Sequence, residues 1–444
     1  MYRLPRSVVS ALVIAALIAG TLSGGREAPA AVAGAIAAVG LAFGVARPIV
    51  GLAVACIVAL IAPFLIVPQR LGIQPPILDV IVGSVFVGVL IERVRRPGNM
   101  APVWLQILVV VGVALPLAAG AAALVDVNHI EAFQIAIKMA LYGATPLIVF
   151  YAVRMRSVLR SSVSLITGAS TIQALLTLVI YVSGSAGLEA LEGLAVAGYP
   201  SSGVARFLPD EITPRATGLL VDPNVLGVTL AAGLPFVVTW MMGRSRRMFP
   251  GVVALVLVCF ALALTLSRAS WIAAVAGLLV WMAVYRPRTA VVLATGLGLA
   301  VLLIPLEQFL RIRNGFAGSD RSAALRVNEL KEAMRVIQRF PLLGIGYGEA
   351  PHADIFAGVS NAWLWLMERA GIFAGLVHLG LIAGVARRAN SHLRFDKDIG
   401  PFYAALVSFT VAGFFDHHIV SFPHLVYLFG SVVGVIVARR AGNS

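Results

Sequence analysis

Long apolar runs, separated by short polar loops, recur from one end of this chain to the other. Runs of about 17–25 residues are long enough to cross a bilayer as helices, and continuous rather than alternating apolarity disfavours a β-barrel. The expected spans are roughly residues 7–23, 30–46, 48–67, 77–92, 103–124, 132–152, 161–183, 218–242, 250–266, 270–285, 289–305, 361–386, 401–415 and 423–438. The pattern predicts an all-α, polytopic integral membrane protein with about 12–14 transmembrane helices, forming one transmembrane domain over residues 1–444.

Composition supports this prediction. The 444 residues are 60% hydrophobic and 12% charged, about half the charged fraction of a soluble protein. A net charge of +14 would suit nucleic acid, but most of the excess lies in short loops between spans. Those basic loops alternate along the chain as the positive-inside rule requires. We therefore expect a cytoplasmic-membrane protein with both termini in the cytoplasm, and a retained helix rather than a signal peptide at residues 7–23.

Two long loops then fall on the outer side, at residues 184–217 and 306–360. Irregular backbone is not tolerated in lipid, so both loops are expected at the outer surface or packed into the protein. The second contains a predicted amphipathic helix that ends at Pro341 and lies on the membrane or caps a cavity. Its apolar side is Val327, Leu330, Met334 and Ile337, and its polar side is Asn328, Glu332, Arg335 and Arg339.

Some charges of this helix are candidates for binding. A solvated face is the simplest account of most of them, whereas Arg321 and Arg326, at its start, are better candidates for substrate binding. The glycine-rich GIGYG at Gly344–Gly348 follows a helix rather than a strand, so it predicts a turn and not a phosphate cradle.

Two arginines stand beside apolar runs. Arg268, in LTLSRASWIAA, lies in a hairpin with barely enough residues for two crossings, so it is held near the outer boundary. Burying an arginine there costs about 2.5 kcal/mol or more unless it faces a wet cavity or an anion. Arg215 precedes a span whose helix is predicted to begin at Asp222–Pro223. Snorkelling to lipid headgroups is the alternative for both, but two guanidinium forks at one level favour a shared diphosphate.

Other candidates are single residues. Lys138, in the outer part of its span, is either a second phosphate contact or the partner of an acidic residue such as Asp79. His352, in the second outer loop, suits a general base, with an exposed loop histidine as the alternative. Zinc-binding spacing is absent, also around His417 and His418, so we expect neither a metal nor a cofactor.

Four segments, in this order, resemble the bacterial O-antigen ligase and polymerase superfamily of membrane glycosyltransferases. They are RATGLLVDPNVLG, LTLSRASWIAA, SDRSAALRVNELKEAMRVIQRFPLLGIGYG and SNAWLWLMERAGIFAGLV, which together cover about residues 205–385. The first half of the chain matches in hydropathy alone. Family members often have His-Asn where this chain has Ser360-Asn361, so either His352 takes over the role of the base or this member works without a histidine.

The resemblance implies a GT-C-like fold and metal-independent, inverting glycosyl transfer at the outer face. The implied donor is a glycan on a polyprenyl diphosphate, and the acceptor is another glycan or a glycolipid. The implied catalytic residues are Arg215, Arg268 and His352, and the implied substrate-binding residues are Lys138, Arg206, Arg321, Arg326 and Asn361. A flippase or transporter of lipid-linked saccharides is the alternative, although transporters usually place their polar groups near the midplane. A glycosyltransferase type that uses an acidic residue in its first outer loop is disfavoured, because that loop holds only Glu27.

Overall fold

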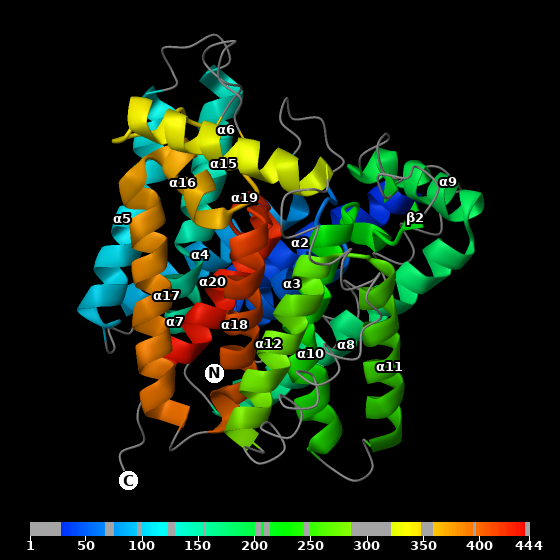
Figure 1. The fold of residues 1–444 in the computed structure, drawn as a ribbon. Helices are drawn as coiled ribbons and strands as arrows, with labels where there is room; N and C mark the ends of the chain where they lie inside the picture. The colour runs from blue at the N-terminus through cyan, green and yellow to red at the C-terminus, as the bar shows by residue number, and fades with distance from the viewer. Residues whose placement is uncertain are drawn as a thin grey trace. The chain divides into compact units, whose positions relative to one another are not determined.

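The computed structural model shows an all-α membrane protein, as the hydropathy pattern predicts (Figure 1). It describes residues 28–66, 75–95, 100–122, 129–153, 156–199, 206–207, 214–243, 248–285, 321–347, 358–393 and 397–439. The chain divides into two compact units, Met1–Asn99 with Tyr151–Arg268, and Met100–Phe150 with Ala269–Ser444.

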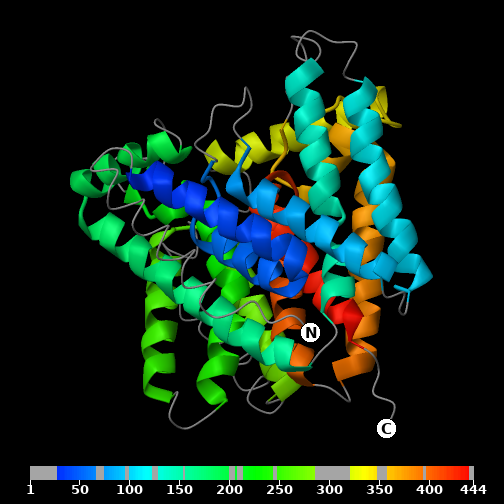
Figure 2. The same cartoon turned by 180° about the vertical axis from the view of Figure 1, so that it is seen from behind.

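The first unit is built on closely packed helices. Its elements are α2 (Ala28–Ala46), α3 (Pro48–Ile61), α4 (Ile77–Arg95), α8 (Arg156–Val182), α9 (Ser185–Gly193), η2 (Leu194–Ala197), β1 (Arg206–Phe207), β2 (Pro214–Arg215), η3 (Gly218–Leu220), α10 (Pro223–Met242) and α11 (Met248–Leu264). α2 lies along α4, both in blue in Figure 2. A Cβ on Gly88 would lie 2.3 Å from the Gly44 carbonyl oxygen. Small residues at such crossings let helices in a membrane approach closely.

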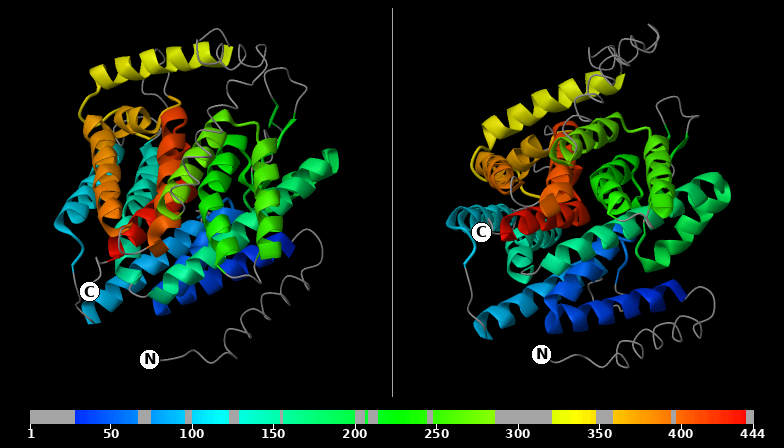
Figure 3. Two further views of the ribbon diagram at one scale, coloured as in Figure 1. Left: turned by 60° about the horizontal axis from the view of Figure 1, so that its bottom comes forward. Right: turned by 90° about the horizontal axis from the view of Figure 1, so that it is seen from below.

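The second unit holds the remaining helices. They are α5 (Val103–Ala122), α6 (His129–Gly143), α7 (Thr145–Ala152), α12 (Arg268–Tyr285), α15 (Arg321–Arg339), α16 (Ala362–Ala370), α17 (Ile372–Leu393), η5 (Lys397–Ile399), α18 (Gly400–Phe415), α19 (His418–Ser421) and α20 (Pro423–Ala438). α7 and α12 each have residues on both sides of the division between the units. In Figure 3, α15 is the long yellow helix, and it packs against α16.

Seven described helical segments are long and apolar enough to cross a membrane, and four shorter apolar helices accompany them. The long ones lie at Val103–Ala121, Glu131–Ala152, Leu159–Val182, Pro223–Met242, Arg268–Tyr285, Ile372–Asn390 and Lys397–Phe415. The expected spans 7–23 and 289–305 lie outside the described residues. The expected span 77–92 is helical but carries charges at both ends, so it is not among the seven.

One expected span is interrupted by a single residue and another is broken. In the segment 132–152, Ala144 separates α6 from α7, but Glu131–Ala152 is still long and apolar enough to cross a membrane. The segment 361–386 divides at Gly371, whose φ of 85° ends α16 before α17 begins. A Cβ on Gly371 would lie 1.9 Å from the Leu342 carbonyl oxygen, so this close backbone approach requires glycine. Hydropathy averaged over a segment does not register such a break, because most residues of the segment are apolar.

The predicted amphipathic helix is present as α15, but its buried face differs from the expected one. Ala333, Val336 and Ile337 are buried. The expected apolar residues Val327, Leu330 and Met334 keep 46%, 46% and 44% of their surface exposed. Sequence periodicity finds the apolar stripe of a helix, whereas the tertiary contacts decide which part of it is covered.

Candidate functional site

In the first unit, the segment of Arg215 lies against the turn that precedes Arg268. The Arg215 Nε donates to the Thr265 carbonyl oxygen, and Nη2 donates to Asn224 Oδ1, both at 2.9 Å. The Ala216 amide donates to the Leu264 carbonyl oxygen, also at 2.9 Å. Arg215 is half-buried, and these contacts fix the plane of its guanidinium group. Two segments separated by 50 positions are thereby joined at one arginine.

The elements around Arg215 explain how the chain places it. Asp222 caps α10 and accepts from the amides of Asn224 and Val225 at 2.8 and 3.1 Å, with Pro223 in the first turn. This start of α10 is the one predicted from Asp-Pro. The cap therefore orients the Asn224 side chain that receives Arg215.

A polar stripe on α8 supports η3, which follows Arg215. Gln173 and Thr177 are fully buried, and a Cβ on Gly218 would lie 2.3 Å from the Thr177 Oγ1. With its amide oriented to satisfy both groups, Gln173 donates to the Ile61 carbonyl oxygen and accepts from the Leu219 amide, each at 3.3 Å. Buried polar side chains are stable when they bond in this way, so the stripe fixes the backbone after Arg215.

The turn that leads to Arg268 is tight, as expected from the length of the hairpin. Leu266 has a φ of 51°, a conformation that costs a residue with a Cβ about 1–2 kcal/mol. The Ser267 amide donates to Thr265 Oγ1 at 3.3 Å. Arg268 is the first residue of α12 and is exposed. The Arg215 side chain thus binds Thr265, which stands three positions before Arg268 in the chain.

In the second unit, α15 is fastened to the segment before α16. The Ser360 hydroxyl and amide both donate to Glu329 Oε2, at 2.7 and 3.1 Å. Asn361 then caps α16, accepting from the amides of Trp363 and Leu364, each at 3.1 Å. Ser360, which stands where the resemblance leads us to expect a histidine, therefore binds a carboxylate through its hydroxyl.

The backbone of the glycine-rich stretch after α15 forms hydrogen bonds with the end of α16. The amides of Ile345 and Gly346 donate to the carbonyl oxygens of Glu368 and Arg369, at 2.9 and 3.0 Å. These bonds satisfy carbonyls that a helix end leaves open. The described part of GIGYG therefore begins in a turn, as predicted, and Ile345 and Gly346 cap the end of α16.

Glu368 is the fully buried carboxyl group of this region. Its Oε1 accepts from the Gly358 amide at 3.0 Å. Burial raises the pKa of Glu368, while the neighbouring Arg369 and the Gly358 bond lower it. Burial also raises the pKa of the Tyr347 hydroxyl above its usual range. Neither group was a candidate from the sequence, although a glutamate within an apolar stretch is a usable signal.

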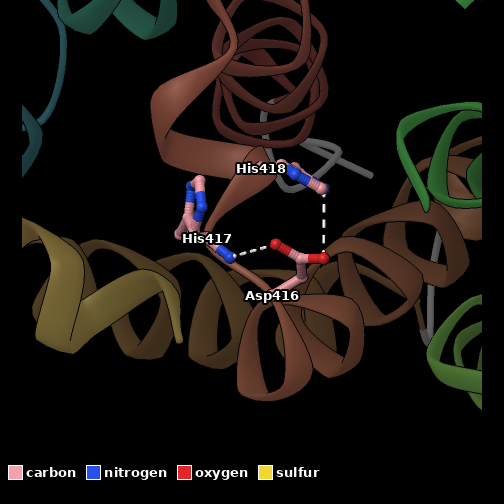
Figure 4. Close-up of side chains that lie close together, drawn as sticks. All are labelled: Asp416, His417 and His418. Carbon is pink, nitrogen blue, oxygen red and sulfur yellow. Dashed lines mark hydrogen bonds and ion pairs between the residues drawn. The ribbon is translucent and has the colours of Figure 1, made fainter. Parts of the chain in front are cut away.

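Asp416, His417 and His418 form a third cluster, at the turn from α18 to α19 (Figure 4). Asp416 Oδ2 lies 3.2 Å from His418 Nδ1, and Oδ1 accepts from the His417 amide at 2.8 Å. The His417 Nδ1 lies 2.7 Å from Ser421 Oγ, and its ring stacks on Trp365. One ligand atom from each of the three residues lies within 4.8 Å of the others. The sequence offered these histidines without a role, because their spacing matches no zinc motif.

The remaining predicted residues are not gathered into one described site. Lys138 is half-buried on α6, and Arg326 is exposed on α15. Arg206 is paired with Arg215 across β1 and β2, but its side chain lies outside the described residues. The Arg321 side chain and the whole of His352 also lie outside them. The roles of all these residues stay predictions.

Comparison with known proteins found a match to a segment that contains several of the residues described above. Residues 253–379 match the family model described as O-antigen ligase. Comparison with curated proteins found no match. The matched segment contains Arg268, Glu329, Asn361 and Glu368, and it ends before the Asp416 cluster. This match over residues 253–379 supports the resemblance to the O-antigen ligase and polymerase superfamily.

Proposed function

We propose that this protein transfers a glycan from a polyprenyl diphosphate to a sugar hydroxyl of another glycan or a glycolipid, at the outer face of the cytoplasmic membrane. The observation that carries the proposal is the contact of Arg215 with the turn before Arg268. Two guanidinium groups on adjoining backbone segments suit the several oxygens of one diphosphate, and they stay charged at any working pH.

The chemistry follows from the leaving group. When the bond between the sugar and the diphosphate breaks, negative charge grows on the departing oxygen. Fixed cations that meet this charge lower the barrier, and a metal ion is not required for this role. Asn224 and the Thr265 carbonyl hold the Arg215 guanidinium in place, so it does not have to reorganise during the reaction. Attack by the acceptor from the opposite face inverts the anomeric centre.

The other predicted residues have subordinate roles in this proposal. Lys138, Arg321 and Arg326 contribute further positive charge for the substrate, and Arg206 does so from the strand paired with Arg215. Asn361 orients a sugar or the adjoining loop. His352 is the proton acceptor expected from the sequence.

Reconstitution of the purified protein with a lipid-diphosphate glycan tests the proposal. Arg268→Ala should lower transfer by about 10²–10³, the usual effect of removing one group that stabilises transition-state charge. Arg160→Ala, which removes an exposed arginine on α8, is the matched control and should leave transfer unchanged. Chelation of divalent metal should also leave it unchanged, and a strict metal requirement would contradict the mechanism.

The same assay separates the possible functions. A ladder of products identifies a polymerase, and a single transfer to a different acceptor identifies a ligase. In cells, Arg268→Ala should abolish the polymer or conjugate while lipid-linked units still reach the outer leaflet. If those units instead stayed on the cytoplasmic leaflet, a flippase would be the better interpretation.

A further inference from the structure

The pair of Asp416 and His418 is an arrangement that ordinary packing does not require. Each side chain is 11% exposed, and Asp416 Oδ2 lies 3.2 Å from His418 Nδ1 (Figure 4). The rings of His417 and Phe422 each lie 4.9 Å from the His418 ring, edge to face. A largely buried carboxylate is costly unless it has polar partners, and buried charge pairs of this kind are common at functional sites.

The pair is attached to the start of α16, within the same unit. The Asn361 side-chain amide donates to the Phe414 carbonyl oxygen at 3.2 Å, two residues before Asp416. On the other side of the pair, the His417 ring stacks on Trp365 with centroids 5.9 Å apart and planes 12° apart. α16 lies within the segment that matches the O-antigen ligase model. The turn after α18, which follows the matched segment in the chain, thus lies beside Ser360-Asn361, where family members often have His-Asn.

We propose that His418, oriented and charge-stabilised by Asp416, accepts the proton of the acceptor hydroxyl in place of His352. This inference rests on the proposed glycosyl transfer. Because Nδ1 faces the carboxylate, Nε2 is the proton-accepting nitrogen. The hydroxyl oxygen forms a bond to the anomeric carbon, and its proton passes to Nε2. The bond from that carbon to the diphosphate oxygen breaks, and its electron pair leaves with the lipid diphosphate. Asp416 stabilises the imidazolium that forms.

A metal ion is the other possible occupant of this cluster, since three potential ligand atoms lie close together. The geometry favours the proton-accepting pair, because His417 Nδ1 already lies 2.7 Å from Ser421 Oγ. Metal analysis of the purified protein distinguishes the two. One equivalent of tightly bound metal that is lost in Asp416→Asn would overturn the proposal.

The decisive experiment measures kcat of the detergent-purified protein with saturating donor and acceptor. His418→Ala should lower kcat by about 10²–10⁴, the usual contribution of a general base, while donor binding, measured separately, stays unchanged. Added imidazole should restore His418→Ala at least about tenfold, an effect that a merely structural histidine would not give. His418→Gln keeps most of the side-chain volume and replaces the alanine variant if that variant does not fold.

Matched variants complete the design. His378→Gln changes a half-buried histidine on α17, outside the cluster, whose ring contacts Phe429, and should keep turnover within about threefold. His418 variants within threefold of the wild type, or loss of activity in His352→Gln but not in His418→Gln, would overturn the assignment. If the wild type itself moved no glycan from a lipid diphosphate, the proposed function would fail. Transfer by both wild type and variants would remove only the role of His418.

Discussion

Replacing Glu329 with glutamine should loosen α15 from the segment before α16. One carboxylate oxygen accepts from both the hydroxyl and the amide of Ser360, at 2.7 and 3.1 Å. Hydrogen bonds to a charged group contribute about 1.5–3 kcal/mol each, against about 0.5–1.5 kcal/mol for neutral ones. Losing the charge from two such bonds would cost about 2–3 kcal/mol if they were buried. Both residues are half-exposed, so we expect about 1–2 kcal/mol.

The assay is a double-mutant cycle of Glu329→Gln and Ser360→Ala, with the free energy of unfolding measured in mixed detergent. The two changes should be coupled by about 1 kcal/mol, because each removes the partner of the other. Glu332→Gln is the matched control. Glu332 lies 2.7 Å from Arg335 on the same helix, an exposed pair worth about 0.5 kcal/mol or less. A Glu329 effect no larger than the Glu332 effect, without coupling to Ser360, would refute the reasoning.

Two further predictions concern the end of α16. Burial raises the pKa of Glu368 above its ordinary value of 4.5. The contribution of Glu368 to protein stability should therefore be greatest below pH 4.5 and should fall as pH rises through the higher pKa of the folded state. Glu368→Gln should therefore be more stable than the wild type at neutral pH and flatten this part of a thermal-stability profile; a steeper loss with pH would contradict it. Gly344→Ala should cost about 1–2 kcal/mol for its φ of 65° alone, and its Cβ would also lie 2.4 Å from the Glu368 carbonyl oxygen. Gly83→Ala, with open space around its Cβ, is the control in the same unfolding measurement. Equal effects of the two substitutions would show that the close approach of Gly344 to the end of α16 contributes little to stability.

Part of the candidate site was visible in the sequence because its signals are local. Asp222 and Pro223 predicted the start of α10, since a cap and a first-turn proline act within a few residues. Arg215 and Arg268 stood out because a charge beside an apolar run is costly. The contacts between distant segments were not predictable. Thr265 meets Arg215 across 50 positions, and Ser360 meets Glu329 across 31, and no periodicity connects such distant segments.

The sequence by itself determined the all-α class, most of the described apolar helices and the amphipathic helix of residues 321–339, because all three depend on apolar spacing along one segment. Tertiary structure alone decided which apolar residues are covered, since lipid and protein interior are similarly apolar. It therefore left Leu330 exposed and buried Val336. It also decided the break at Gly371 and the pairing of Asp416 with His418, because close backbone approach and side-chain distances arise only when separate segments pack together.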